Sequence, residues 1–229
     1  MNNLAIIPAR GGSKRIPRKN IRDFLGKPII AYSIETALQS RMFEEVMVST
    51  DDEEIAEIAK TYGAKVPFMR SASAADDFAT TADVLLEVID NYAQAGRRFT
   101  NGCCIYPTSP LLTTQTLQAA YEKMVTEKLN SVFPVIQFSY PIYRALAFSE
   151  NRISMIWPEN LNMRSQDLPP AYHDAGQFYW FNIESFLSDQ KLFTDNSNAI
   201  VIDEKDAQDI DNETDWHLAE LKFRLRTAF

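Results

Sequence analysis

Residues 10–20, Arg-Gly-Gly-Ser-Lys-Arg-Ile-Pro-Arg-Lys-Asn, have the composition of an anion-binding loop. They follow residues 3–7, an apolar stretch of the length of a buried strand. Two adjacent glycines leave backbone N–H groups accessible to an anion, and the arginines and lysines supply charge for phosphate oxygens. The spacing is not that of a Walker loop, and the third glycine of the dinucleotide fingerprint is missing. The segment therefore predicts a phosphate site of another kind.

Two carboxylates near the end of the chain could hold a metal ion beside such phosphates. Asp209 and Asp211 are two residues apart, so in an extended chain both side chains point to the same side. Magnesium is commonly held by one or two carboxylates together with nucleotide phosphate oxygens. We therefore predict a Mg2+ site at these residues, although Asp-x-Asp before a helix is also a common capping sequence.

Charge is unevenly distributed along the sequence. The 229 residues include 23 Lys and Arg and 31 Asp and Glu, a net charge of −8, which argues against nucleic-acid or membrane partners. Seven of the basic residues lie within residues 10–27, where only Asp23 opposes them. This cluster indicates one local anionic ligand. With no leader, no apolar stretch of membrane-spanning length and only two adjacent cysteines, the sequence is expected to be cytoplasmic.

Apolar stretches of strand length alternate with helical patterns over most of the chain. Such alternation is typical of a parallel sheet with helices on both faces, so we predict one α/β domain, residues 1–229, with a Rossmann-like, mostly parallel sheet. Ligands of these sheets bind beyond the carboxyl ends of the strands. The strands are expected at residues 3–7, 46–50, 64–68, 103–106, 131–135 and 199–202, and the helices from Pro28, at 51–62, 81–95 and 115–128, and after Asp211.

The alternation stops between residues 138 and 181. Two proline clusters and the aromatic run 172–181 replace it, which indicates a small β-rich insertion. The aromatic density exceeds what a small appendage could bury alone, and exposed apolar patches usually mark interfaces. We therefore predict a homodimer held through residues 138–181, with Tyr179, Trp180 and Phe181 in the dimer core.

Four motifs together resemble the CMP-sialic acid synthetase family. They are Ile-Pro-Ala-Arg-Gly-Gly-Ser-Lys with Pro-Arg-Lys-Asn (7–14 and 17–20), Val-Ser-Thr-Asp-Asp (48–52), Pro-Thr-Ser-Pro-Leu (107–111) and Asp-Ile-Asp (209–211). Their order and spacing match over nearly the whole chain. The resemblance implies an enzyme that joins CTP to an acidic nine-carbon sugar, a nonulosonic acid, and releases pyrophosphate.

The resemblance also implies roles for individual residues. Lys19 would neutralise charge on the α-phosphate, Arg10 would neutralise the leaving pyrophosphate, and Asp209 and Asp211 would hold Mg2+. Asp211 is, in addition, a candidate base by proximity. Pro8 and Ala9 would lie against cytosine. The residues implied for the nucleotide are Pro8, Ala9, Arg10, Gly11, Lys14, Lys19, Asn20, Arg70 and Thr81.

Sugar selection is expected to depend on other positions. Tyr106 stands where relatives that use N-acetylneuraminate have glutamine, which disfavours that sugar. Residues 171–181 resemble the branch of the family that activates pseudaminic acid, a deoxygenated and diacylated relative. An acidic sugar needs a cation for its carboxylate, and Arg164 in the insertion could provide it. The predicted sugar-binding residues are Tyr106, Arg164, His173 and Gln177.

Other functions remain as alternatives. The chain could use N-acetylneuraminate or legionaminate as its sugar, with 3-deoxy-manno-octulosonate a more distant possibility. Outside the enzymes, a nucleotide- or RNA-binding module could use the basic loop without chemistry. Asp209 and Asp211 argue against such a module, because a passive phosphate binder gains nothing from carboxylates beside its ligand.

Overall fold

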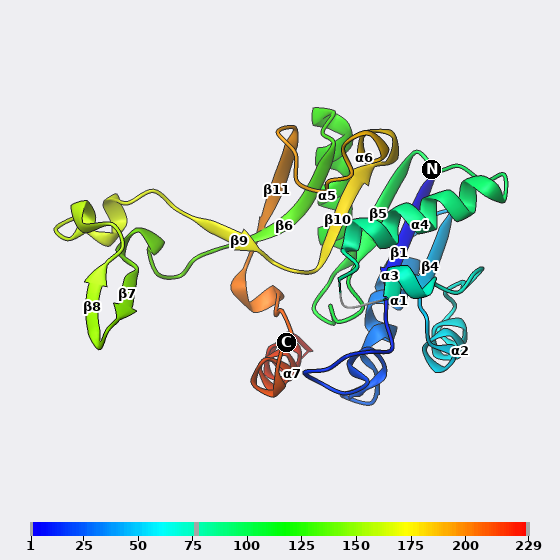
Figure 1. Cartoon of the computed structure of the whole chain (residues 1–229), viewed down its shortest axis with the longest axis horizontal. Coiled ribbons are helices and arrows are strands. Elements are labelled where there is room, and N and C mark those ends of the chain that lie inside the picture. The colour runs from blue at the N-terminus through cyan, green and yellow to red at the C-terminus, as the bar shows by residue number, and fades with distance from the viewer. Residues whose placement is uncertain (1, 76–77, 228–229) are drawn as a thin grey trace.

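The computed structural model describes residues 2–75 and 78–227 (Figure 1). Its main sheet contains, in spatial order, β11 (Ser197–Ile202), β6 (Ser131–Gln137), β10 (Phe178–Asn182), β5 (Asn101–Ile105), β1 (Asn3–Pro8) and β4 (Glu45–Ser49), with β9 (Tyr172–Asp174) paired to β6. β4, β1, β5, β6 and β11 run parallel to one another, whereas β10 and β9 are antiparallel to their neighbours. The mostly parallel sheet predicted from the sequence is confirmed.

Helices cover both faces of this sheet, as predicted. α1, α2 and α5 pack on one face with Ala5 and Ile7 of β1, and α4 and α6 pack on the other with Leu4 and Ile6. The side chains of β1 are therefore buried on both faces of the sheet. This burial on both faces explains why the strand contains no alternating polar residues. The helices are α1 (Ile29–Ser40), α2 (Glu53–Thr61), α3 (Ala72–Ala75), α4 (Thr81–Gln94), α5 (Thr114–Glu127), α6 (Ile183–Asp189) and α7 (Glu213–Thr227).

The connections contain two short hairpins and several 3-10 helices. The four strands of the two hairpins form separate two-stranded sheets and do not join the main sheet. The elements are β2 (Asp23–Phe24), β3 (Lys27–Pro28), β7 (Leu146–Ser149), β8 (Arg152–Met155), η1 (Lys19–Ile21), η2 (Ile142–Arg144), η3 (Pro158–Asn160), η4 (Ser165–Asp167) and η5 (Glu204–Asp206).

Two expectations about strands were wrong. Residues 64–68 do not form a strand: they contribute only an isolated parallel bridge from Lys65 to Met47. Residues 178–182, expected at the end of the insertion, form β10 between β5 and β6 in the main sheet. Trp180 and Phe181 are 0% and 1% exposed, so they belong to the core of this chain and not to a dimer core. The close approach of β10 to β5 requires Gly102, because a Cβ there would lie 2.3 Å from the Phe181 ring.

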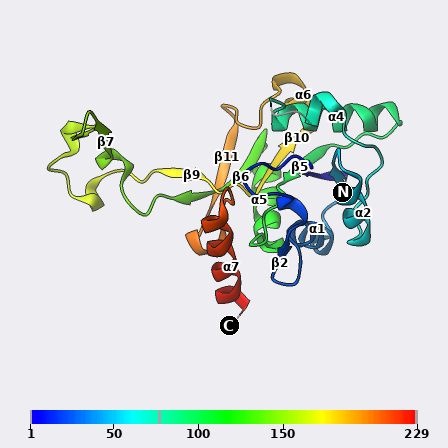
Figure 2. The same ribbon diagram turned by 60° about the horizontal axis from the view of Figure 1, so that its bottom comes forward.

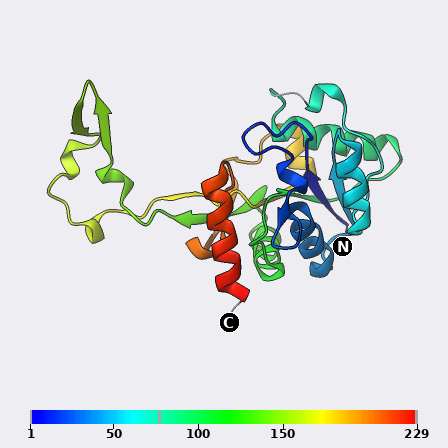
Figure 3. The same cartoon turned by 90° about the horizontal axis from the view of Figure 1, so that it is seen from below.

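Residues 138–171 form the arm, which projects from the sheet in all three views (Figures 1, 2 and 3). Its hairpin, β7–β8, turns through Glu150 and Asn151, whose positive φ angles of 49° and 62° suit a tight two-residue turn. No residue of this segment is buried. The arm therefore has no core of its own within the chain.

The C-terminal helix packs on the segment that follows the basic loop. The Phe24 ring contacts Tyr32, Trp216 and Phe223 edge-on at centroid distances of 5.4, 5.5 and 5.8 Å. Arg22 lies 4.5 Å above the Trp216 ring. This cluster connects α7 to the loop after β1, although the two are far apart in sequence. No helix in the described part of the chain is long and apolar enough to cross a membrane.

A buried carboxylate joins β4 to the loop after α4. The Glu45 side chain is 1% exposed, pairs with Lys65 at 2.8 Å and with Arg97, and accepts from the Tyr92 hydroxyl. Burial raises the pKa of Glu45, but the bonds to Lys65, Tyr92 and Arg97 outweigh it and the pKa lies below its usual value. Its ionised form therefore stabilises the folded protein above the unfolded-state pKa of about 4.3, and this stabilisation is lost as the pH falls through the lower folded-state pKa.

We expect Glu45→Gln to lower the free energy of unfolding at neutral pH by about 2–4 kcal/mol. The variant removes the buried negative charge that Lys65 and Arg97 both contact. Its neighbour Glu44 is the matched control, because that side chain is 50% exposed and pairs with Arg97 at the surface. Urea denaturation from neutral pH to about pH 2 should show the gap between wild type and Glu45→Gln narrowing at low pH. A gap that does not change with pH, or an equal loss in Glu44→Gln, would contradict this role.

Candidate functional site

A cavity of about 540 Å³ lies beyond the carboxyl ends of β1 and β5. Ligands of parallel α/β sheets bind at this edge. The cavity gathers residues from the start, middle and end of the chain. Those predicted from the sequence that line it are Pro8, Arg10, Lys14, Lys19, Asn20, Arg70, Thr81, Tyr106, Asp209 and Asp211.

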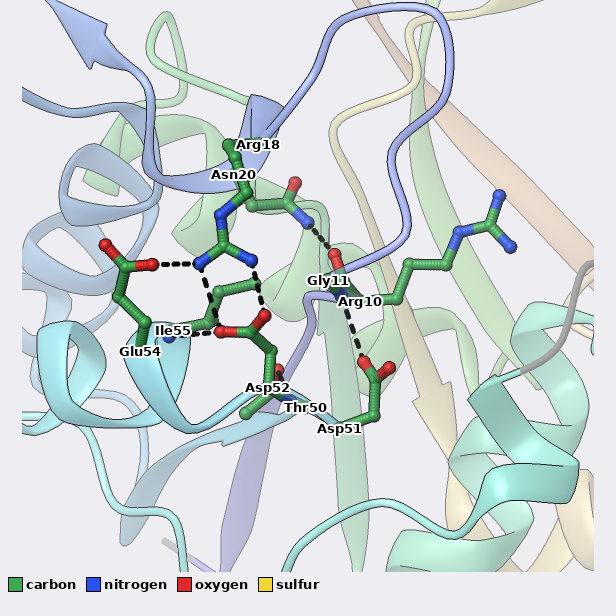
Figure 4. Close-up of polar contacts among 9 residues, drawn as sticks. All are labelled: Arg10, Gly11, Arg18, Asn20, Thr50, Asp51, Asp52, Glu54 and Ile55. Carbon is green, nitrogen blue, oxygen red and sulfur yellow. Dashed lines mark hydrogen bonds and ion pairs between the residues drawn. The ribbon is translucent and has the colours of Figure 1, made fainter.

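Arg18 anchors the basic loop to the turn after β4 (Figure 4). Its guanidinium pairs with Asp52 and Glu54, and the distance from Nη2 to Oδ1 of Asp52 is 3.1 Å. Asp52 also caps α2 by accepting a hydrogen bond from the Ile55 N–H at 3.0 Å. The hydrogen bond from Arg18 is the main reason that the Asp52 pKa lies below its usual value. The Val-Ser-Thr-Asp-Asp motif thus holds the loop in place.

Backbone contacts fix the start of the same loop. The Gly11 N–H donates to Oδ1 of Asp51 at 3.0 Å, and the Asn20 amide donates to the Arg10 carbonyl at 2.9 Å. In Figure 4 the Arg10 side chain extends away from these contacts. Gly11 does not line the cavity, and its N–H, expected to face an anion, is bonded to a carboxylate instead.

The two glycines of the loop have different surroundings. A Cβ on Gly11 would lie 2.7 Å from Oδ2 and 3.0 Å from Cβ of Asp52, whereas a Cβ on Gly12 would meet nothing within 4 Å. Asp52 is not free to move aside, because Arg18 and the first turn of α2 hold it. The absence of a side chain at Gly11 is therefore needed for the loop to lie against this turn.

We expect Gly11→Ala to lower kcat/KM for the nucleotide at least about tenfold, because displacing the loop misplaces the basic side chains that line the cavity. Gly12→Ala is the matched control and should stay close to wild type. Initial rates at varied nucleotide concentration test this difference. Equal effects of the two substitutions would show that the contact with Asp52 is unimportant.

Ile210 directs the two aspartates into the cavity. Its side chain is fully buried in a cluster with Ile16 and Trp216, so the side chains that flank it face the opposite way. Both Asp209 and Asp211 line the cavity. The same packing joins the basic loop, which carries Ile16, to the aspartate motif.

Lys19, near the end of the basic loop, connects this loop to the aspartate motif. Its Nζ donates to the Ile210 carbonyl at 2.6 Å. Burial lowers the pKa of Lys19, and the charges of Asp211 and Asp209 partly oppose this effect. Burial also raises the pKa of Asp209, and the nearby charge of Asp211 adds to the rise. Lys19 is therefore a half-buried cation whose charge is stabilised by two nearby carboxylates.

The aspartate pair suits a divalent cation. The two carboxylates repel each other in a partly buried position, and Arg15 already pairs with Asp211 at 2.8 Å. In the described residues, no group of three or more His, Cys, Asp or Glu side chains could hold a metal. Carboxylate oxygens are the ligands that Mg2+ prefers, and it usually takes the remainder from water and phosphate. The donor set therefore fits Mg2+ bound together with a nucleotide.

Arg70 contributes a buried cation to the cavity wall. The residue is 7% exposed, and its Nε donates to the Ser49 hydroxyl at 3.0 Å. A second nitrogen donates to the Ser49 carbonyl, and burial lowers the Arg70 pKa. These contacts fix the guanidinium beyond the end of β4. Ala9, also predicted for the nucleotide, is buried behind the cavity and donates its N–H to the same Ser49 carbonyl at 2.9 Å.

The predicted sugar-binding residues are divided by the structure. Tyr106 lines the cavity, and its phenol lies 3.4 Å from the Thr81 hydroxyl. Gln177 is 2% exposed, does not line the cavity, and donates its amide to the Asp206 carbonyl at 2.7 Å. The backbone carbonyl of Gln177 accepts a hydrogen bond from the backbone N–H of Tyr106 at 2.9 Å. Gln177 therefore supports the strand end that carries Tyr106.

The two remaining candidates lie away from the cavity. Arg164 is in the arm, where it pairs with Asp167 at 2.7 Å. His173 is exposed on β9 and packs against the Phe138 ring at a centroid distance of 4.8 Å. Neither side chain lines the cavity of its own chain.

Several residues of the cavity wall were not predicted. Ser13 and Arg15 belong to the basic loop, and Pro107 and Thr108 belong to a motif already recognised, so these four carried a signal. The residues from α3 and around the start of α4 carried no such signal in the sequence. They are small or apolar, and only the folding of distant segments brings them to the cavity. The unpredicted residues are Ser13, Arg15, Ile16, Ala74, Ala79, Thr80, Val84, Pro107 and Thr108.

Comparisons with known proteins agree with this geometry. A protein from Campylobacter jejuni subsp. jejuni named pseudaminic acid cytidylyltransferase is 44% identical over 98% of this chain and 97% of its own length. A CMP-N,N'-diacetyllegionaminic acid synthase from Legionella pneumophila is 34% identical over 96% and 95%. The solved structure of CMP:2-keto-3-deoxy-manno-octonic acid synthetase complexed with CTP has the same fold, with a TM-score of 0.71, 17% identity and full coverage of both chains. The model of the family described as cytidylyltransferase matches residues 4–214, and the chain belongs to this family.

Proposed function

We propose that this enzyme transfers CMP from CTP to the anomeric hydroxyl of pseudaminic acid and releases pyrophosphate. The observation that carries the proposal is the meeting of three basic side chains, Arg10, Lys14 and Lys19, with Asp209 and Asp211 in one cavity. The 44% identity to the Campylobacter protein named pseudaminic acid cytidylyltransferase supports the choice of nucleotide and sugar.

CTP would bind along the loop after β1. Pro8, at the end of the strand, would lie against the cytosine ring, and the basic side chains would contact the phosphates. Asn20 and Thr81 would contact the nucleotide on the two sides of the cavity. A cavity wall that is rich in cations and borders two carboxylates suits a metal-bound triphosphate better than a neutral ligand.

The reaction is a displacement at the α-phosphorus. The anomeric hydroxyl attacks and gives up its proton, for which Asp211 is the candidate acceptor. The bond from the α-phosphorus to the bridging oxygen breaks, and pyrophosphate leaves with the displaced electron pair. Phosphoryl transfer of this kind depends mainly on positioning and on charge stabilisation. Lys19 would stabilise charge on the α-phosphate, and Arg10 would stabilise the leaving pyrophosphate. Mg2+ held by Asp209 and Asp211 would neutralise phosphate charge and lower the pKa of the attacking hydroxyl.

The sugar would bind at the Tyr106 end of the cavity. Because Arg164 in the arm and His173 on β9 lie outside the cavity of their own chain, they would reach a sugar only from a second copy. The arm would then serve both dimerisation and substrate binding. Because CTP and free sugar acids are metabolites of the cell interior, we place the reaction in the cytoplasm.

We expect the protein to be a homodimer that is held through the arm. Phe148 and Ile153, on facing strands of the hairpin, are 71% and 64% exposed, and large exposed apolar patches usually mark an interface. Phe148→Asp together with Ile153→Asp should yield a monomer in sedimentation velocity at micromolar concentration. Val125→Asp, at a 52% exposed position of α5, is the control and should stay dimeric. A monomeric wild type with full activity would contradict the expectation.

Pyrophosphate release tests the function directly. With CTP, Mg2+ and pseudaminic acid, purified protein should release pyrophosphate and form CMP-pseudaminic acid, and omission of the sugar should abolish both. A second candidate, CMP-legionaminate synthesis, is supported by the 34% identity to the Legionella enzyme. CMP-N-acetylneuraminate synthesis is a further alternative from the sequence. Product formation with either of these sugars but not with pseudaminic acid would reject the proposed substrate.

A further inference from the structure

One ion pair in the cavity wall joins the basic loop to the aspartate motif. Arg15 and Asp211 both line the cavity, and Nη1 of Arg15 lies 2.8 Å from Oδ2 of Asp211. The loop is the part of the wall proposed to hold the phosphates, and the aspartates are the part proposed to hold the metal. The carboxylate assigned to the metal is therefore paired with a cation of the protein itself.

Packing behind the cavity wall brings this pair together. In the sequence Arg15 is directly followed by Ile16. Asp211 is directly preceded by Ile210. The two isoleucines are 1% and 0% exposed and belong to the same buried cluster. Because this cluster joins the two backbones, their charged neighbours meet at the cavity although they come from opposite ends of the chain.

Arg15 is held more loosely than the other cation beside the aspartates. Its side chain is 70% exposed, and that of its partner Asp211 is 43% exposed. An ion pair this accessible to water changes an equilibrium constant by a factor of at most about five. Lys19, in contrast, is half-buried and donates to the Ile210 carbonyl at 2.6 Å. Arg15 is therefore the cation that can change its partner.

A triphosphate in the cavity offers Arg15 a stronger partner than Asp211. A guanidinium binds phosphate oxygens through paired N–H donors, and a triphosphate carries more negative charge than a single carboxylate. Arg10, Lys14 and Lys19 line the same cavity, so phosphates bound by them lie within the wall that carries Arg15. Once Arg15 pairs with a phosphate, Oδ2 of Asp211 becomes available to a metal.

We infer that Arg15 couples the binding of CTP to the binding of Mg2+. It competes with the metal for Asp211, and the phosphates of CTP remove this competition by pairing with Arg15. CTP and Mg2+ therefore each raise the affinity for the other, by linkage by the same factor. The inference rests on the proposed function, because that proposal assigns CTP to the basic loop and Mg2+ to the aspartates.

Metal binding without nucleotide tests the competition. Arg15→Gln removes the charge that pairs with Asp211 and leaves both aspartates in place. We expect this variant to bind Mn2+, a paramagnetic substitute for Mg2+, about two- to fivefold more tightly than the wild type in electron paramagnetic resonance titrations. A gain in affinity is informative, because damage to the fold would lower it.

Two further variants control for the loss of a positive charge. Arg15→Lys keeps the charge but not the guanidinium, and its affinity for Mn2+ should lie between those of the wild type and Arg15→Gln. Lys27→Gln removes a cation that pairs with Glu35 outside the cavity, and it should bind Mn2+ as the wild type does.

CTP binding tests the coupling. Calorimetry without the sugar gives the dissociation constant of CTP in EDTA and in Mg2+, and the first value divided by the second is the coupling ratio. Formation of Mg–CTP in free solution is the same for every variant, so it cancels when the ratios are compared. The coupling ratio of Arg15→Gln should be about two- to fivefold smaller than that of the wild type. The ratio of Lys27→Gln should equal that of the wild type.

The outcomes separate this inference from the proposed function. If the wild type binds CTP and Mg2+ but Arg15→Gln has the wild-type coupling ratio, the inference fails and the function stands. Equal or weaker binding of Mn2+ by Arg15→Gln also overturns the inference. If Mn2+ binding without nucleotide is too weak to measure in both proteins, the coupling ratio decides by itself. A wild type that binds no CTP rejects the proposed function instead.

Discussion

Asp211→Asn is expected to lower kcat by a factor on the order of 100–1,000 while the protein keeps its fold. The substitution preserves the size of the side chain but removes one of the two negative charges that would bind Mg2+. Rates at saturating CTP with increasing Mg2+ should show that Asp211→Asn needs far more metal than the wild type.

The control for this prediction is a carboxylate outside the cavity. Asp189→Asn, at the last residue of α6, should keep wild-type activity and wild-type dependence on Mg2+. The wild type itself should lose turnover in excess EDTA and regain it when Mg2+ is restored. Full turnover by Asp211→Asn, or by the wild type in EDTA, would reject the assignment of the metal site.

Lys19→Met should have an effect of similar size, at least about a hundredfold on kcat. Methionine keeps most of the side chain but removes the charge that would stabilise the α-phosphate. It also removes the hydrogen bond to the Ile210 carbonyl. An interaction that strengthens in the transition state appears in kcat, whereas uniform ground-state binding appears in KM. We therefore expect a smaller change in the KM for CTP than in kcat.

Lys27→Met is the matched control. Lys27 belongs to the same basic cluster in the sequence, but it lies 4.1 Å above the Tyr32 ring and pairs with Glu35, away from the cavity. Its loss should leave kcat and the KM for CTP within about twofold of wild type. If Lys27→Met and Lys19→Met reduce kcat equally, the basic cluster acts through its total charge and not through Lys19.

Local patterns in the sequence predicted the part of the fold in which parallel strands alternate with helices along the chain. β1 is apolar on both faces and is followed by the basic loop, so the position of that loop at the sheet edge follows from the strand alone. Asp209 and Asp211 could likewise be placed on one side because they are two residues apart in an extended segment, and the burial of Ile210 between them agrees with this.

The central position of β10 could not be predicted in this way. It returns to the sheet after the arm and pairs with β5 and β6, and such pairing between distant segments leaves no periodic signal in either one. The aromatic run that it carries therefore looked like part of the insertion, although Trp180 stacks on Phe43 in the core at 5.0 Å. The prediction of a strand at residues 64–68 was wrong for another reason. They have strand-like composition, but they lie beside β4 for a single bridge only.

The cavity wall shows the same division. The charged residues of the loop were predicted from their own spacing, and Arg70 and Thr81 only through a family resemblance. Thr81 reaches the cavity because the capping box of Thr80 and Asp83 starts α4 there. Gln177, predicted to bind the sugar, lies outside the cavity because its amide donates to the Asp206 carbonyl, a contact between segments far apart in the sequence.

A competition between sugars tests the central claim most directly. Equal concentrations of pseudaminic acid and N-acetylneuraminic acid are supplied with limiting CTP and Mg2+, and the two CMP-sugars and pyrophosphate are followed by phosphorus NMR. The product ratio equals the ratio of kcat/KM for the two acids. We predict an excess of CMP-pseudaminic acid of at least about tenfold, with one pyrophosphate released per CMP-sugar formed. An equal mixture, an excess of CMP-N-acetylneuraminic acid, or pyrophosphate without either product would contradict the account.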